Sequence, residues 1–146
     1  MRVKLPPLEN LVRIRQLKSE LPNRTEFKGL IRAAKNGLQD ARKKTLHPDS
    51  RFHLAYNAAH ALSLAALRWH GYRSENRYTV FQSLPHTLGL PAAQWRVLDQ
   101  SHRKRNLAEY EREIDIDPAL LDALIEVIEI LQIAVDALPQ IPASSG

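Results

Sequence analysis

One segment limits the possible folds more than any other, residues 51–72, which read RFHLAYNAAHALSLAALRWHGY. From Phe52 to Trp69 the apolar residues cover most of the circumference of a helix, and alanine is frequent among them. A helix that is apolar on nearly every side must be surrounded by other elements, and small side chains let those neighbours approach closely. We therefore expect a central helix over residues 50–70, capped by Asp49 or Ser50 and stopped at Gly71.

Three further segments with helical spacing are long enough to pack around this helix, over residues 25–44, 91–112 and 118–138. Thr25 is the expected N-cap of the first, Pro91 begins the second, and Asp117 with Pro118 begins the third. Shorter helical pieces are expected over residues 8–21 and 79–84, and no stretch alternates as a strand does. The predicted fold class is all-α, a bundle of four to five helices.

The chain has the size of one domain, with 146 residues and no cysteine. We expect a short N-terminal helix and linker over residues 1–24, the bundle core over 25–138 and a mobile tail over 139–146. No apolar run has the length of a membrane span, and the basic N-terminus lacks the apolar region of a secretory signal. These features predict a cytoplasmic protein that does not enter a membrane.

The charges are unevenly spread along the chain. Residues 1–51 carry 13 Lys and Arg against 5 Asp and Glu, whereas residues 52–146 carry 8 against 11. Six of these 13 basic side chains lie on the outer face of the helix expected over 25–44, namely Lys28, Arg32, Lys35, Arg42, Lys43 and Lys44. Such a face suits phosphates, nucleic acid or an acidic partner, and it is equally typical of a solvated surface that keeps a protein soluble.

The helix expected over residues 91–112 ends in a dense polar cluster. Trp95 and Leu98 begin an apolar stripe, and Arg105 occupies that stripe two turns later. A guanidinium in that position needs a partner inside the fold or a pocket open to a ligand. Helical spacing gives the cluster its further members; they are Arg103, Asn106, Glu109 and Tyr110. The alternative is a salt-bridged helix end with no chemistry.

A narrow polar stripe interrupts the central helix. His53, Asn57 and His60 share one face at spacings of four and three residues. We interpret them as a hydrogen-bonded seam and predict no metal and no cofactor, because the stripe holds no carboxylate and no second helix offers a matching His or Glu pair. The remaining histidines, His47, His70, His86 and His102, look isolated and receive no ligand role.

The last helix is apolar on more than one side. Ile116, Ile130 and Ile133 widen its stripe beyond what one neighbour can cover. A second apolar face suits a homodimer.

Two segments together resemble the HEPN superfamily of prokaryotic helical-bundle domains. The first is residues 51–72 followed by RYTVF, similar to the long alanine-rich helix, loop and short helix of that family. The second, residues 103–110, is similar to the family signature of an arginine, a polar residue and a histidine four to six residues after the arginine. The two segments cover about half of the chain. In this resemblance Arg105 matches the arginine, Asn106 the polar residue, and Tyr110 stands at the histidine position.

The resemblance implies metal-independent ribonuclease activity, toxin-antitoxin or defence systems, and a cleft shared by two protomers. Tyr110 departs from the pattern, because an unperturbed tyrosine does not change protonation near neutral pH as histidine does. The position that partner nucleotidyltransferases modify in some toxin pairs is Arg112 here, so that mechanism is not supported.

Three hypotheses follow from these residues. The first is a module that binds RNA, a nucleotide or a protein partner such as an antitoxin, through Arg103, Arg105, Asn106 and Tyr110 beside the His53–His60 stripe. The second is an endoribonuclease toxin, in which Arg105 stabilises the pentacoordinate phosphate and Tyr110, His53 or His60 transfers protons. The third is a purely structural or assembly role. The sequence therefore leaves open whether the protein is an enzyme.

Overall fold

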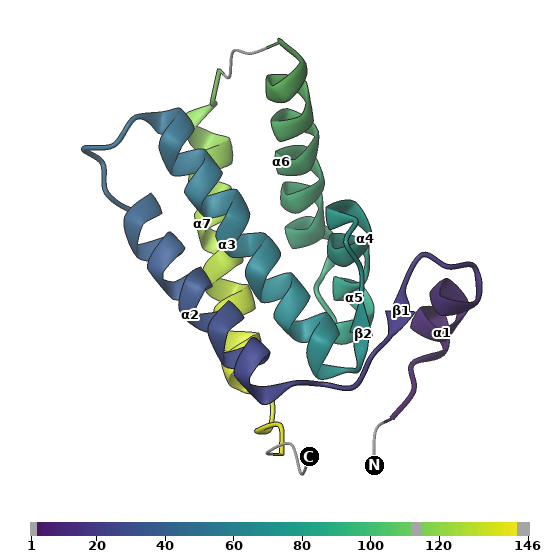
Figure 1. Cartoon of the computed structure of the whole chain (residues 1–146). Helices are drawn as coiled ribbons and strands as arrows, with labels where there is room; N and C mark the ends of the chain where they lie inside the picture. Colours follow the sequence, from purple (N-terminus) through teal and green to yellow (C-terminus); the bar gives the residue numbers. More distant parts are fainter. Residues whose placement is uncertain (1–2, 112–114, 143–146) are drawn as a thin grey trace.

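The computed structural model describes residues 3–111 and 115–142, with side chains described through Ala108 in the first range. The elements are mostly helices and follow in the order α1 (Pro6–Arg13), β1 (Lys18–Ser19), α2 (Arg24–Ala41), α3 (Pro48–Trp69), β2 (Tyr72–Arg73), α4 (Arg77–Gln82), α5 (Leu84–Thr87), α6 (Ala92–Glu111) and α7 (Pro118–Asp136). Figure 1 shows the long helices side by side, with the short elements gathered at one end. The expected all-α bundle is confirmed.

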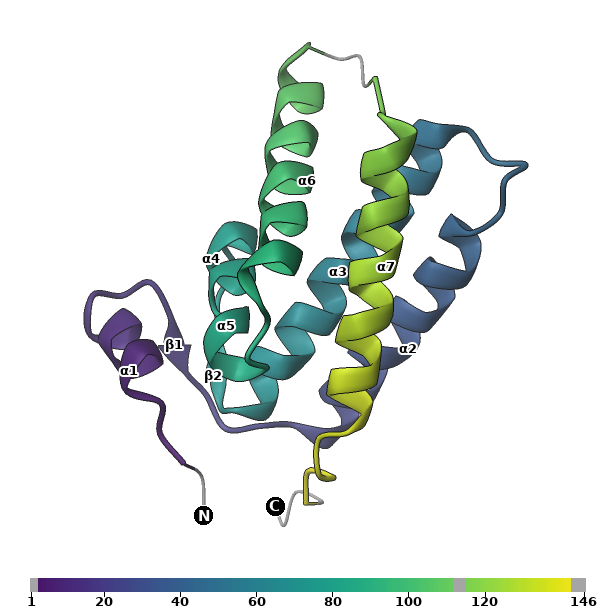
Figure 2. The ribbon, with the colours of Figure 1, turned by 180° about the vertical axis from the view of Figure 1, so that it is seen from behind.

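The alanine-rich helix α3 lies at the centre of the bundle. It packs against α2 and α7 along most of its length and against α4, α5 and α6 on its other side (Figures 1 and 2). The approach of α2 is close at Gly37, where a Cβ atom would lie 3.3 Å from the carbonyl oxygen of Leu54 and 3.4 Å from the Cβ of Ala58. The small side chains of α3 therefore serve the close packing that the sequence predicts.

The helix boundaries follow capping chemistry, although not always at the predicted residue. Asn23, rather than Thr25, caps α2 by accepting a hydrogen bond from the amide of Glu26 at 2.8 Å. At α3, His47 is the N-cap and makes no side-chain capping bond, so the expectation of Asp49 or Ser50 is wrong. Asp117 caps α7 through the amide of Ala119, as predicted. Gly71 has a φ of 89°, the left-handed conformation that glycine adopts readily after a helix.

The segment from residue 8 to residue 21 differs from the single helix expected there. The helix α1 ends at Arg13, and the chain then turns through Arg15, which has a φ of 64°. After this turn, β1 pairs antiparallel with β2, with Lys18 opposite Arg73 and Ser19 opposite Tyr72. Apolar spacing alone did not reveal the turn, because Leu17, which follows it, is buried just as a leucine on the apolar face of a continuing helix would be.

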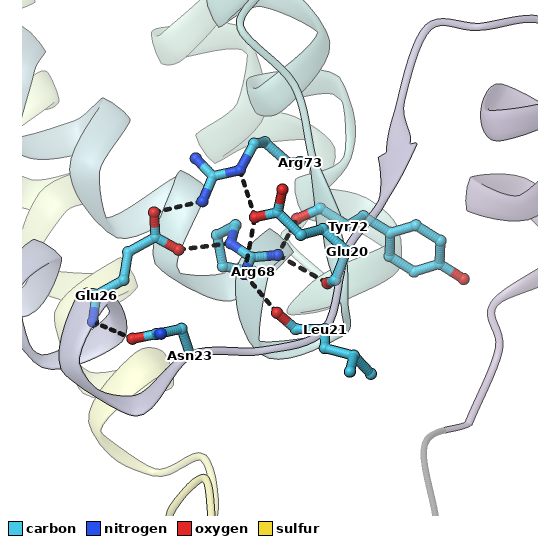
Figure 3. Close-up of polar contacts among 7 residues, drawn as sticks. All are labelled: Glu20, Leu21, Asn23, Glu26, Arg68, Tyr72 and Arg73. Atoms are coloured by element: carbon cyan, nitrogen blue, oxygen red, sulfur yellow. Dashed lines mark hydrogen bonds and ion pairs between the residues drawn. The ribbon is translucent and has the colours of Figure 1, made fainter. Parts of the chain in front are cut away.

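A buried arginine fixes this N-terminal arm to the bundle (Figure 3). Arg68, near the end of α3, is 1% exposed. Its guanidinium donates to Glu26 at 2.6 Å and to the main-chain oxygens of Glu20 at 2.8 Å and Leu21 at 2.6 Å. Arg73 binds both Glu20 and Glu26 from the other side. Burial alone would raise the pKa of Glu26, but the hydrogen bonds from Arg73 and Arg68 outweigh it and lower that pKa.

The C-terminal residues that the structure describes are packed rather than extended into solvent. The indole N–H of Trp69 donates to the main-chain oxygen of Pro139 at 2.7 Å, and Ile141 is buried. The tail expected from residue 139 onward therefore contacts the bundle at least as far as Ile141, and residues 143–146 lie outside the described range.

Within the described ranges, no helix combines the length and the apolar character that crossing a lipid bilayer requires.

Candidate functional site

The candidate site is a cluster of titratable and cationic side chains around Tyr56, which lies on the side of α3 that faces α4 and α6. Its ring packs edge-on against Phe81 of α4, with ring centres 5.7 Å apart, and stacks on Phe52 one turn earlier. The hydroxyl group lies 2.8 Å from Nδ1 of His102 on α6. A buried phenol needs such a partner, and this one joins two helices that are far apart in the sequence.

His102 is the second member of the site, so its description as an isolated histidine is wrong. Its ring lies against Tyr56 and Tyr78, and its Nε2 lies 3.2 Å from the amide nitrogen of Asn106. With that amide donating to Nε2, a neutral His102 carries its proton on Nδ1 and donates it to the oxygen of Tyr56. The hydroxyl hydrogen of Tyr56 is then available to another acceptor.

Two guanidinium groups flank the phenol. The Cζ atoms of Arg105 from α6 and Arg77 from α4 lie 5.1 Å and 5.6 Å from the centre of the Tyr56 ring. Arg77 also donates to the side-chain oxygen of Asn57 on α3, at 3.1 Å. Its position is fixed locally, because Asn76 caps α4 through the amide of Thr79 and Arg77 is the first helical residue.

The positive charges of these two arginines affect the pKa values of the neighbouring titratable groups. Burial, followed by the positive charges of Arg77 and Arg105, lowers the pKa of His60 from 6.5 to about 4. Burial, followed by the charge of Arg105, also lowers the pKa of His102. Burial raises the pKa of Tyr56 although both arginines oppose the rise. The histidines are therefore neutral at pH 7, and the positive charge of the site resides on the arginines.

Asp99 organises the rim of the site. One of its carboxylate oxygens accepts from the hydroxyl of Tyr78 at 2.9 Å, and the other accepts from Nε of Arg103 at 3.1 Å. Arg103 thus forms an ion pair with Asp99, which lies one turn earlier on α6, and the side chain of Arg103 is exposed. It lies at the edge of the site rather than beside Tyr56.

The structure brings together only part of the predicted set. Arg105 and Asn106 lie in the site, and Asn57 joins it through Arg77. His53 is exposed on the outer side of α3, while the ring of His60 packs edge-on against Phe81 and its Nε2 makes no hydrogen bond within the described residues. The side chains of Glu109 and Tyr110, and all of Arg112, lie outside the described residues.

Sequence reasoning missed Tyr56, Arg77 and His102. Tyr56 falls on the apolar face of α3 and looks like an ordinary core residue, and Arg77 belongs to a helix too short to show periodicity. One signal was available for His102, because it precedes Asn106 by one helical turn and Arg105 by three residues on the same side.

The described residues contain no group of three His, Cys, Asp or Glu side chains arranged to hold a metal ion. A cavity of about 890 Å³ lies at the other end of α3 and is lined in part by Glu20, Glu26, Arg68 and Arg73. These four charges already pair with one another, so the cavity offers a ligand no net charge.

Comparison of the chain with protein-family models, with curated proteins and with solved structures found no match. The candidate site therefore rests on its own geometry.

Proposed function

We propose that the face formed by α3, α4 and α6 binds the phosphate groups of single-stranded RNA, and that the chain is an RNA-binding module of the HEPN type. The observation that carries the proposal is the convergence of Arg77 and Arg105 on the Tyr56–His102 pair. Two arginines from separate helices provide forked donors that can hold a phosphate group.

Aromatic side chains beside the arginines suit the bases of such a ligand. Tyr78 is partly exposed, and its ring contacts both His102 and Trp95. Bases of single-stranded RNA stack on exposed rings of this kind while arginines hold the backbone. The resemblance of residues 103–110 to the HEPN signature supports the same ligand class, since Arg105 and Asn106 are the two matched residues that reach the site.

The test measures binding of a fluorescently labelled single-stranded RNA by anisotropy across a salt series. Replacing Arg77 and Arg105 by Gln is expected to weaken binding at least about tenfold and to reduce the salt slope, since each lost phosphate contact removes about 0.7 from it. Arg96→Gln is the matched control. Arg96 lies on α6, the helix that carries Arg105. It is nine residues before Arg105, on the opposite face of the helix, and is exposed.

Wild-type affinity and salt slope in the double variant would contradict the proposal. An equal loss from Arg96→Gln would also contradict it, because the binding would then reflect the net charge of the protein rather than this site.

A second candidate function is metal-independent RNA cleavage, and one observation favours it. His102 is hydrogen-bonded to Tyr56 beside Arg105, which supplies the histidine that position 110 lacks. In such a reaction Nε2 of a neutral His102 would exchange its bond with Asn106 for the 2′-hydroxyl and accept its proton, while Arg105 stabilises the charge of the pentacoordinate phosphate. This activity would be established if the protein cleaves RNA in the presence of EDTA, if His102→Gln abolishes the cleavage and if Tyr110→Phe leaves it intact. Binding without cleavage would instead support the RNA-binding module alone. A role in a toxin-antitoxin system, with an antitoxin or nucleotidyltransferase as partner, stays a prediction.

A further inference from the structure

A pocket of about 270 Å³ lies between the N-terminal arm and the segment that enters α4. One wall is residues 15–18, the turn after α1 and the first residue of β1, and the other is residues 73–76, the end of β2 and its connection to α4. Figure 1 shows β2 leading into α4 along this connection. The next residue is Arg77, one of the two arginines beside Tyr56, and neighbouring Cα atoms are about 3.8 Å apart. The pocket therefore adjoins the candidate site.

The pairing of β1 with β2 brings two cations together at this pocket. Lys18 lies directly opposite Arg73 in the antiparallel pair. Like charges in this arrangement repel each other across the ladder unless an anion compensates them. Arg73 is compensated by Glu20 and Glu26, which both bind its guanidinium (Figure 3). Lys18 is exposed and makes no ion pair within the described residues, so its charge is available to a ligand.

Arg15 gives the pocket a second available cation. It is exposed, lines the same pocket and makes no ion pair in the part of the chain that the structure describes. Glu75, which is also exposed, is the one carboxylate among the described residues that line the pocket. Arg73 belongs to a neutral cluster with Arg68 and the two glutamates. The charges that remain at the pocket are two cations and one carboxylate, so its net charge is positive.

We infer that this pocket holds a further phosphate group of the RNA strand that the Tyr56 site binds. The inference rests on the proposed function and extends it, because it adds a second point at which the protein holds the backbone of the same strand. An internal phosphate of RNA carries a single negative charge, which the excess positive charge of the pocket can neutralise. Arg15 offers forked donors to its oxygens, and Lys18 adds a point charge.

The N-terminal arm holds these cations in place before any ligand arrives. Leu17 is buried in the smaller apolar core, and the main-chain oxygen of Glu20 accepts from Arg68 at 2.8 Å. The chain is thus anchored on both sides of Lys18. A charged group that is already positioned loses less freedom when it binds than one on a mobile segment.

One strand can reach both the pocket and the Tyr56 site. Arg73 and Arg77 are four residues apart, so their Cα atoms are separated by at most about 15 Å. Even at the duplex rise of about 3.4 Å per nucleotide, about six nucleotides span that distance. The pocket therefore lies within reach of a short single-stranded RNA.

Fluorescence anisotropy with a labelled single-stranded RNA of about 16 nucleotides, titrated with the full chain across a salt series, tests the inference. The variant Arg15→Gln, Lys18→Gln is expected to raise the dissociation constant at least about threefold and to lower the salt slope by about 0.7, the share of one phosphate contact. Arg32→Gln, Lys44→Gln is the matched control. It also removes one arginine and one lysine, at exposed positions outside both walls of the pocket, and should leave the affinity close to that of wild type.

Glu75 supplies a test of the opposite sign. Glu75→Gln removes a negative charge beside the bound phosphate, so the dissociation constant should fall. Glu126→Gln makes the same change in net charge at an exposed position of α7 and should leave the dissociation constant unchanged. Weaker binding by Glu75→Gln would contradict the inference, because the pocket would then not hold an anion.

The two proposals fail in different ways. Wild-type affinity in Arg15→Gln, Lys18→Gln, together with a loss from the Arg77 and Arg105 variant, would overturn this inference and leave the proposed function. The reverse result would overturn the proposed function and leave the pocket as an RNA contact. An equal loss from the control Arg32→Gln, Lys44→Gln would overturn this inference, since net charge would then explain the binding. Far-UV circular dichroism checks that each variant, changed only at exposed positions, keeps its fold.

Discussion

At the scale of single residues, His60 links the candidate site to the pH dependence of the free energy of unfolding. Its pKa falls from 6.5 to about 4 because its ring is buried beside two cations, Arg77 and Arg105. In the unfolded chain the same histidine titrates near 6.5. Between these values the unfolded state binds a proton that the folded state excludes, so the free energy of unfolding falls as the pH drops through this window.

We predict that His60→Gln removes a defined part of the acid sensitivity. Wild type should lose up to about 3 kcal/mol through this residue between pH 7 and pH 4, because about 2.5 pKa units separate the folded and the unfolded state. Urea unfolding at pH 7, 6 and 5 measures the slope, and the variant should show the shallower one. Parallel slopes in the two proteins would contradict the assignment.

The residues of the site show what a sequence can reveal about a function. Arg105 and Asn106 were predictable because a cation in an apolar stripe is unexpected. Tyr56 was not, since an aromatic residue on an apolar helix face is almost always core, and only the fold shows that its hydroxyl reaches His102. Arg77 was hidden for another reason, because its helix is six residues long.

At the scale of elements, the end of α3 depends on Arg68. Removing its guanidinium leaves Glu26 and the main-chain oxygens of Glu20 and Leu21 without the donor that holds them against α3. We predict that Arg68→Ala lowers the free energy of unfolding by about 2–3 kcal/mol, because it removes several hydrogen bonds from a charged donor together with the packing of a buried side chain.

Arg42→Ala is the comparison. Its pair with Glu129 is equally short at 2.7 Å, but both side chains are about half exposed. We expect a loss below about 1 kcal/mol in the same urea experiment. Equal losses from the two variants would show that burial does not control the contribution of these pairs.

Helix periodicity located the long elements to within a few residues, and it failed where the elements are short. The expected helix over residues 8–21 contains α1, a turn at Arg15 and β1. A strand of two residues has no period to detect, and its pairing partner, β2, lies more than fifty residues later. Arg68 went unnoticed for the same physical reason, because its partners come from a distant segment.

At the scale of the whole molecule, α3 joins two apolar cores. The larger core lies between α2, α3, α6 and α7, and the smaller one holds Leu8, Leu17, Leu67, Tyr72 and Val80. Because Leu67 and Val80 belong to α3 and α4, the N-terminal arm should unfold together with the bundle rather than before it.

We predict that Leu8→Ala, at a side chain that is 0% exposed, lowers the free energy of unfolding by about 2–5 kcal/mol. The loss should appear in the main transition followed by circular dichroism at 222 nm. If the arm were an independent appendage, the midpoint of that transition would not move. Ile14→Ala, at an exposed position on the same arm, should change the midpoint little.

The general architecture was predictable because a helix that is apolar on most sides requires neighbours on most sides. The order of the helices around α3 was not, because it depends on contacts between distant residues such as Gly37 with Leu54 and Arg42 with Glu129. The same holds for the site, which three helices assemble.

The hydrogen bond from the Trp69 indole to the main-chain oxygen of Pro139 makes Trp69 a fluorescent reporter of the segment that follows α7. Trp95 bonds instead to the main-chain oxygen of Phe81, inside the bundle. With Trp95→Phe, the remaining emission comes from one ring whose surroundings change when the segment after α7 lifts away. Quenching by iodide would then follow that detachment in real time, separately from global unfolding.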